Sequence, residues 1–150
     1  MLSRRTLLVL AGTTLAFDAR AAPAAQPIDV GDPPPGKALI VFYRKRDYPG
    51  SANTYAVREG VAQLGDLGIG TYFVVAVDPG LHTFNVHAER RSDMQLEVEA
   101  GETYFVRFVL ETGWLLYQPT LEPSEKRLFD QTSVHLARSG APERSVTPTK

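Results

Sequence analysis

The stretch KALIVFYR, residues 37–44, decides the fold of this chain. Its continuous apolar run is rich in β-branched and aromatic residues, which is typical of a β-strand that is covered on both faces. A second run of the same kind, TYFVVAV, occupies residues 71–77. The two runs therefore predict the centre of a β-sheet with further structure packed on each side.

Shorter strands lie on either side of these runs. Residues 94–98 alternate apolar and polar side chains, and residues 103–110 place an apolar set on one face, as half-buried strands do. The remaining strands are predicted at 53–58, 61–64, 81–89 and 114–117. The spacing favours an all-β fold, an antiparallel β-sandwich of about seven to eight strands. One short C-terminal helix is expected near residues 123–131, with Pro123 as its first residue and Leu128 and Phe129 docked on the sheet.

Glycine and proline mark the turns. Asp78, Pro79 and Gly80 form a turn in which proline presets φ and glycine permits a positive φ. His82 follows this turn, and we expect it to form a hydrogen bond across it as a structural residue. The glycine-rich segment 65–70 has no following helix and no Lys-Ser/Thr pair, so it predicts a hairpin rather than a phosphate-binding loop.

The N-terminus has the features of an export signal in residues 1–21. Arg4 and Arg5 precede an apolar stretch, residues 7–17, which is too short to span a membrane. Small residues favour cleavage after Ala21, with Ala24 as a second possibility. The arginine pair resembles a twin-arginine signal, although the general secretory route is equally open. Both routes predict a bacterial protein that is periplasmic or secreted and has no stable membrane span after cleavage.

The rest of the chain divides into three parts. Residues 22–36 contain a run of three prolines and are interpreted as a Pro-rich linker, in effect a disordered N-terminal tail. Residues 37–138 form the β-sandwich domain. Residues 139–150 have no apolar period and are expected to be a disordered tail.

Composition excludes several functional classes. The chain has 150 residues and no cysteine, so disulfides, thiolate nucleophiles and thiolate metal sites are absent. Its formal net charge of −1 argues against a nucleic-acid binder, which would be basic overall. His82 and His87 face opposite sides of one predicted strand, so they do not form a shared metal site. No metal or other cofactor is therefore expected.

Two segments support a family resemblance. VDPGLHTF, residues 77–84, and GETYFV, residues 101–106, resemble the turn and strand of an uncharacterised family of exported bacterial proteins, domain of unknown function 2846, which is distantly similar to PEGA domains. The opening strand, a middle GTY segment at 70–72 and a late QPTL segment at 118–121 are similar to that family as well. The resemblance implies a β-sandwich of the cell envelope. Many members are lipoproteins, but this chain has no cysteine to acylate.

The most distinctive polar cluster follows the predicted strand at residues 37–44. If the sheet brings Arg44, Arg46 and Arg107 together, they form with Tyr48 a cationic patch suited to carboxylates or phosphates of envelope polymers, because guanidinium pairs such groups through two hydrogen bonds. The alternative is a solvated strand end with ordinary surface ion pairs. Aromatic residues too numerous for one core offer a second candidate binding face. They are Tyr43, Tyr48, Tyr55, Phe73, Phe105 and Trp114.

These observations predict a non-catalytic module that binds another envelope protein or an anionic envelope polymer. There is no Gly-x-Ser-x-Gly motif, and the strand carboxylates Glu97 and Glu99 lie where surface charge is ordinary. A carbohydrate-active or carbohydrate-binding periplasmic protein is the alternative, with a groove lined by tyrosine and arginine.

Overall fold

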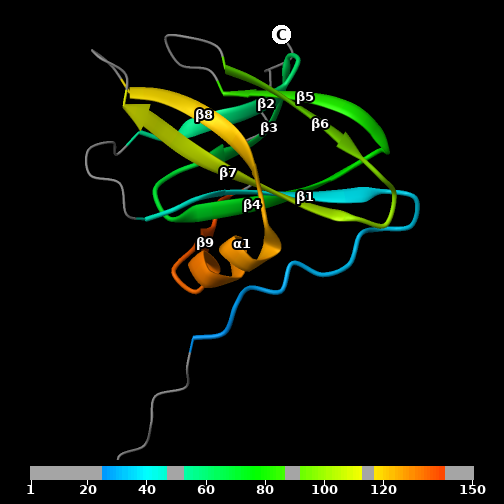
Figure 1. The fold of residues 1–150 in the computed structure, drawn as a ribbon, viewed down its shortest axis with the longest axis horizontal. Coiled ribbons are helices and arrows are strands. Elements are labelled where there is room, and N and C mark those ends of the chain that lie inside the picture. The colour runs from blue at the N-terminus through cyan, green and yellow to red at the C-terminus, as the bar shows by residue number, and fades with distance from the viewer. Residues whose placement is uncertain (1–24, 47–52, 87–91, 113–116, 141–150) are drawn as a thin grey trace, which may run out of the picture.

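The computed structural model describes residues 25–46, 53–86, 92–112 and 117–140. These residues form a β-sandwich with one helix, which confirms the predicted fold class (Figure 1). One sheet has the strand order β8 (Tyr117–Ser124), β7 (Thr103–Thr112), β1 (Ala38–Arg44), β4 (Thr71–Val77) and β9 (Ala137–Arg138). The other has the order β3 (Ala62–Leu67), β2 (Tyr55–Glu59), β5 (Gly80–Val86) and β6 (Ser92–Val98).

Strand direction differs in one respect from the prediction of an antiparallel sandwich. The pairs β1–β7 and β4–β9 are parallel, whereas every other pair is antiparallel. Between β1 and β7 the chain passes to the second sheet twice. It returns first as β4, antiparallel to β1, and then as β7, parallel to β1. The described residues contain nine strands rather than seven or eight, and the two-residue β9 is one that the sequence pattern did not indicate.

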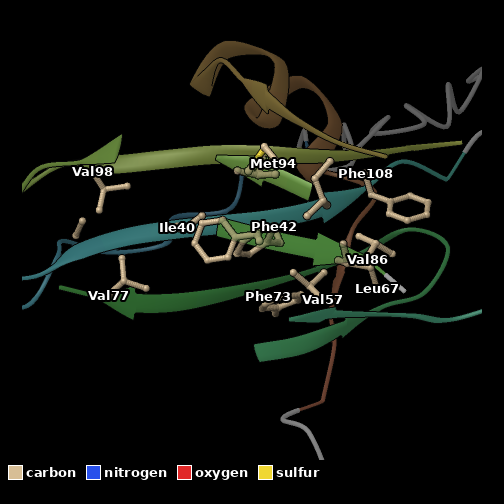
Figure 2. Packing of buried hydrophobic residues seen from close by; sticks show 14 of the residues in the cluster. Ile40, Phe42, Val57, Leu67, Phe73, Val77, Val86, Met94, Val98 and Phe108 are labelled. Carbon is tan, nitrogen blue, oxygen red and sulfur yellow. The ribbon is translucent and has the colours of Figure 1, made fainter. Parts of the chain in front are cut away.

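β1 lies at the centre of the first sheet and is buried along its whole length, as its sequence predicts. Ile40 and Phe42 point between the sheets into the main core, where the Phe42 ring stacks on that of Phe73 (Figure 2). Val41 and Tyr43 point to the opposite side and join a second apolar cluster. The strand therefore separates two cores, which explains its lack of polar alternation.

The second cluster is closed by helix α1 (Lys126–Ser133). Phe129 is fully buried there, with its ring 5.3 Å from that of Tyr43 and 5.1 Å from that of Phe105. The predicted helix start at Pro123 is wrong, because Pro123 pairs with Val106 as part of β8. β8 is an edge strand, where a residue without a backbone N–H is tolerated.

Part of the predicted linker packs on the domain. Residues 27–33, called the strap below, have no helix or strand but lie on the outer side of the first sheet beside α1 (Figure 1). Ile28 and Val30 pack on the second cluster, and the Ile28 backbone N–H donates to Ser133 Oγ at 3.1 Å. The expectation of a free N-terminal tail is therefore wrong for the strap, because its two apolar side chains bury against the sheet and helix.

Two of the glycine-containing turns, segment 65–70 and Asp78–Gly80, carry the chain from one sheet to the other. β3 and β4 belong to different sheets, so segment 65–70 is a corner rather than the predicted hairpin. At Gly65, near the start of this corner, an added Cβ would be 2.7 Å from the Phe73 ring, so a side chain there would have to displace this ring. The turn at Asp78–Gly80 likewise joins β4 to β5 across the two sheets, and Gly80 has a φ of 134°.

Within the described ranges, no helix combines the length and the apolar character needed to cross a membrane. The predicted export signal of residues 1–21 and all but residues 139 and 140 of the predicted disordered tail lie outside these ranges.

Candidate functional site

Arg44 ends β1 on the inward side, in line with Ile40 and Phe42, and only 2% of its surface is exposed. Its guanidinium donates to the Asn53 carbonyl at 2.8 Å and lies over the rings of Tyr55 and Phe108, 5.3 and 4.9 Å from their centres. Burial lowers the pKa of Arg44 below its ordinary value, against the raising effect of Tyr55. Arg44 thus closes one end of the main core and is not available to a ligand on the surface.

Arg107 lies on the opposite face of the same sheet. It pairs in register with Tyr43, whereas Arg44 pairs with Phe108, so the two arginines project from opposite sides. Across the β7–β8 ladder, Arg107 binds Glu122, with its Nη2 2.6 Å and its Nε 2.8 Å from Glu122 Oε2. This is the partner carboxylate that an arginine among apolar neighbours requires.

The predicted patch is therefore not one surface. Of its four residues, Arg44 is internal, Arg107 is neutralised by Glu122, and Tyr48 lies outside the described residues. Among the three members of the patch that the structure describes, Arg46 alone is exposed, and it borders a groove.

This groove has a volume of about 550 Å³ and lies between the end of β1 and α1. We call it the cationic groove; its lining residues are Lys45, Arg46, Leu128, Gln131, Thr132 and His135. Two of them, Lys45 and Arg46, are cationic side chains, and none of the six is a carboxylate. Such a surface can accept a carboxylate or phosphate through the forked guanidinium, the ammonium and the Gln131 amide.

Gly70 positions Arg46 in the groove. Its φ of +66° is one that side chains rarely adopt, and an added Cβ would lie 3.3 Å from Arg46 Cγ. The aliphatic stem of Arg46 thus rests against the backbone of Gly70, which leaves the guanidinium exposed at the surface. The carbonyl of Gly70 in turn accepts the Ala137 backbone N–H at 2.9 Å, so the same glycine ties the segment after α1 to the sheet.

The helix half of the cationic groove was not among the residues predicted from the sequence. The signal that could have found it is helical spacing: Gln131, Thr132 and His135 follow Leu128 by three, four and seven residues and so share its face. His135 lies in the turn that follows α1, and its backbone N–H donates to the Thr132 carbonyl at 3.1 Å.

His82 occupies a different site, at the corner where β4 passes to β5. Its Nε2 is 2.7 Å from the Asp78 carbonyl oxygen, which is the hydrogen bond across the turn that its position predicts, and its Nδ1 is 2.6 Å from Glu59 Oε1. The ring stacks on Phe84. Burial lowers the pKa of His82, but the hydrogen bonds to Asp78 and Glu59 and the charges of both carboxylates raise it above its ordinary value.

The aromatic residues that were predicted to be too numerous for one core are divided between the main core and the second cluster. Phe73 and Tyr55 belong to the main core, whereas Tyr43 and Phe105 belong to the second. The Tyr43 hydroxyl is 2.6 Å from Ser124 Oγ, and burial raises its pKa despite the lowering effects of this bond and of Arg107. The other two members of the predicted aromatic face, Tyr48 and Trp114, lie outside the described residues.

No group of three or more histidine, aspartate or glutamate side chains in the described part of the chain is arranged to hold a metal ion. His87 lies outside that part.

A comparison with protein families finds one match: the model described as Protein of unknown function (DUF2846) matches residues 34–117. No curated protein and no solved structure matches the chain. The matched range includes the strands from β1 to β7 together with Lys45 and Arg46, whereas the strap and α1 lie outside it.

Proposed function

The chain belongs to the DUF2846 family of proteins of unknown function, and from this premise we propose that it is an exported, non-catalytic module that binds an anionic polymer of the cell envelope through the cationic groove. The groove itself is the observation that carries the proposal. It is the place where two of the cations that follow β1 meet a polar helix face around a concave surface. Export rests on the leader pattern of residues 1–21.

The chemistry of the groove favours repeated anionic groups over a single small anion. Lys45 and Arg46 are adjacent in sequence and border an open surface that also contains Gln131 and His135. Each ion pair at such a surface contributes only about 0–1 kcal/mol, so several contacts along a polymer are needed for useful affinity. A polyanion supplies them, and its binding should weaken as salt screens the charges.

The test measures binding of purified protein to poly-glutamate and to polyphosphate, which separate carboxylate from phosphate recognition. We expect the double variant Lys45→Ala/Arg46→Ala to lose about tenfold or more in affinity, as expected for the removal of two cationic contacts. The matched control is Arg127→Ala/Arg138→Ala, which removes two exposed arginines that do not line the groove. A control that weakens binding as much as the groove variant would show that only overall charge matters and would overturn the proposal.

A neutral dextran serves as the third probe. Binding to dextran that survives high salt, without binding to either polyanion, would favour the alternative of a carbohydrate-binding protein. Arg44 is unsuitable as a test residue for either function, since its substitution would disturb the main core.

A further inference from the structure

The cationic groove is lined by two segments of different chemistry. Lys45 and Arg46, which follow β1, supply only hydrogen-bond donors. Gln131 and Thr132, which belong to α1, supply acceptors as well as donors. A ligand that fills this groove must therefore match both chemistries, and negative charge alone matches only the first.

The two cations of the groove are accessible to a ligand. Arg46 is exposed and Lys45 is half-buried, and neither forms an ion pair within the part of the chain that the structure describes. Arg107, in contrast, is held by Glu122. Lys45 and Arg46 can therefore donate to anionic oxygens, but neither offers a lone pair to a hydroxyl group.

The helix side of the groove offers the lone pairs that the cations lack. Gln131 is exposed, and its amide forms no hydrogen bond within the described residues. The Thr132 hydroxyl donates its proton to the Leu128 carbonyl at 2.8 Å, so its oxygen is left to accept. A carboxylate or phosphate group cannot satisfy these acceptors, because it has no proton to donate at neutral pH. A ligand hydroxyl group can.

We propose that the polymer bound in the cationic groove carries hydroxyl groups beside its anionic groups, as an acidic polysaccharide or a polyol phosphate does. This inference rests on the proposed function and names its class of ligand. The anionic group of a repeating unit accepts from Lys45 and Arg46, while a neighbouring hydroxyl donates to Gln131 or Thr132. The groove volume of about 550 Å³ lies in the range of sites that hold small organic molecules, so it accommodates more than a single ion.

The experiment compares polymers that differ in hydroxyl groups but carry equal numbers of charges. Polygalacturonate and poly-glutamate both present carboxylates, and only the first has hydroxyl groups. Poly(glycerol phosphate) and polyphosphate form the corresponding phosphate pair. We expect the wild-type protein to bind the hydroxylated member of at least one pair about tenfold more tightly, because each repeat adds hydrogen bonds. The pair that shows the difference identifies the anionic group as carboxylate or phosphate.

Variants of the helix side test whether this preference comes from the groove. Gln131→Met/Thr132→Val removes both acceptors and nearly keeps the side-chain volumes. It should bind the hydroxylated polymer about tenfold more weakly and the other member of the pair within about twofold of wild type. Gln131→Met alone changes one exposed side chain and should lose about threefold, which keeps the test valid where the double variant does not fold. Gln95→Met is the matched control, an exposed glutamine of β6 outside the groove, and should bind like wild type.

The outcomes separate this inference from the proposed function. Lys45→Ala/Arg46→Ala should weaken the binding of all four polyanions, whereas the helix variants should weaken only that of the hydroxylated ones. A wild-type protein that binds no polyanion would overturn the proposed function and this inference with it. Equal binding of both members of each pair, unchanged in Gln131→Met, would leave the proposed function standing and would overturn this inference alone.

Discussion

The roles of several residues in this chain depend on the face of the strand from which their side chains project. Arg44 and Arg107 are both cations on central strands, yet one closes the main core and the other forms a surface ion pair with Glu122. The alternation that places Ile40 and Phe42 inward also places Arg44 inward, so its role follows from its parity in β1.

Replacing Arg44 by alanine should destabilise the fold without removing a ligand contact. The change leaves the Asn53 carbonyl without this donor and removes the guanidinium from the rings of Tyr55 and Phe108. We expect a loss of about 2–4 kcal/mol in the free energy of unfolding, measured in urea. Arg46→Ala is the control and should change stability by less than about 0.5 kcal/mol. An Arg44→Ala protein that stays as stable as the wild type but no longer binds polyanions would contradict this, because it would assign Arg44 a role in ligand binding.

Gly65 is the second residue with a sharp steric role. Gly65→Ala puts a methyl group 2.7 Å from the Phe73 ring, which must move within a filled core. We expect a destabilisation of about 1–3 kcal/mol by chemical denaturation. Gly140→Ala is a suitable comparison, since an added Cβ there meets nothing within 4 Å and its stability should be unaffected. Similar denaturation midpoints for Gly65→Ala and Gly140→Ala would contradict this, because they would mean that the Phe73 ring moves aside without cost.

At the scale of elements, the strap and α1 together form a cover for the outer side of β1. Neither lies in the range matched by the family model, yet Val41 and Tyr43 are fully buried because the cover is present. The sheet and its cover therefore stabilise each other through the second cluster.

Removing the strap should expose this cluster. Deletion of residues 22–33 takes away Ile28 and Val30 and the hydrogen bond to Ser133. From the apolar area that these half-buried side chains cover, we expect a loss of about 2–4 kcal/mol in the free energy of unfolding. Deletion of residues 22–25 leaves the strap intact and serves as the control. Unchanged stability after the longer deletion would show that the strap packs without contributing to the fold.

At the scale of the whole molecule, the chain passes between the two sheets at several corners, among them segment 65–70 and, as a second, the turn at Asp78–Gly80. The Asp78–Gly80 corner is stabilised by a titratable side chain. His82 contacts both Asp78, which follows the first-sheet strand β4, and Glu59 of the second sheet. Lys37 adds an ion pair to Asp78, with its Nζ 2.6 Å from Asp78 Oδ1. Protonated His82 can donate from both ring nitrogens at once.

The free energy of unfolding should therefore fall as His82 loses its proton. The pKa of His82 is raised in the folded protein, so its contribution is fully present below the unfolded value of about 6.5 and is lost as pH rises through the folded value. We expect the urea midpoint to decrease as the pH rises above about 6.5. His82→Gln should flatten this part of the profile. An unchanged slope in that variant would assign the pH dependence to another group.

The sequence by itself determined the sandwich. An uninterrupted apolar run requires burial of both faces of its strand, whereas an alternating run requires burial of one face. The sequence also indicated the family resemblance, the turn at Asp78–Gly80 and the docking of Phe129. Local patterns could not place Pro123, which is equally compatible with a first helical turn and an edge strand.

Only the tertiary structure decided which cations share a surface. Arg44 and Arg107 diverge because parallel pairing of β1 with β7 sets Arg44 beside Phe108 and Arg107 beside Tyr43. The cationic groove arises because α1 returns to the end of β1 from far along the chain. Periodicity reports whether a side chain is buried, whereas the partners it meets depend on strand order and register between segments distant in sequence.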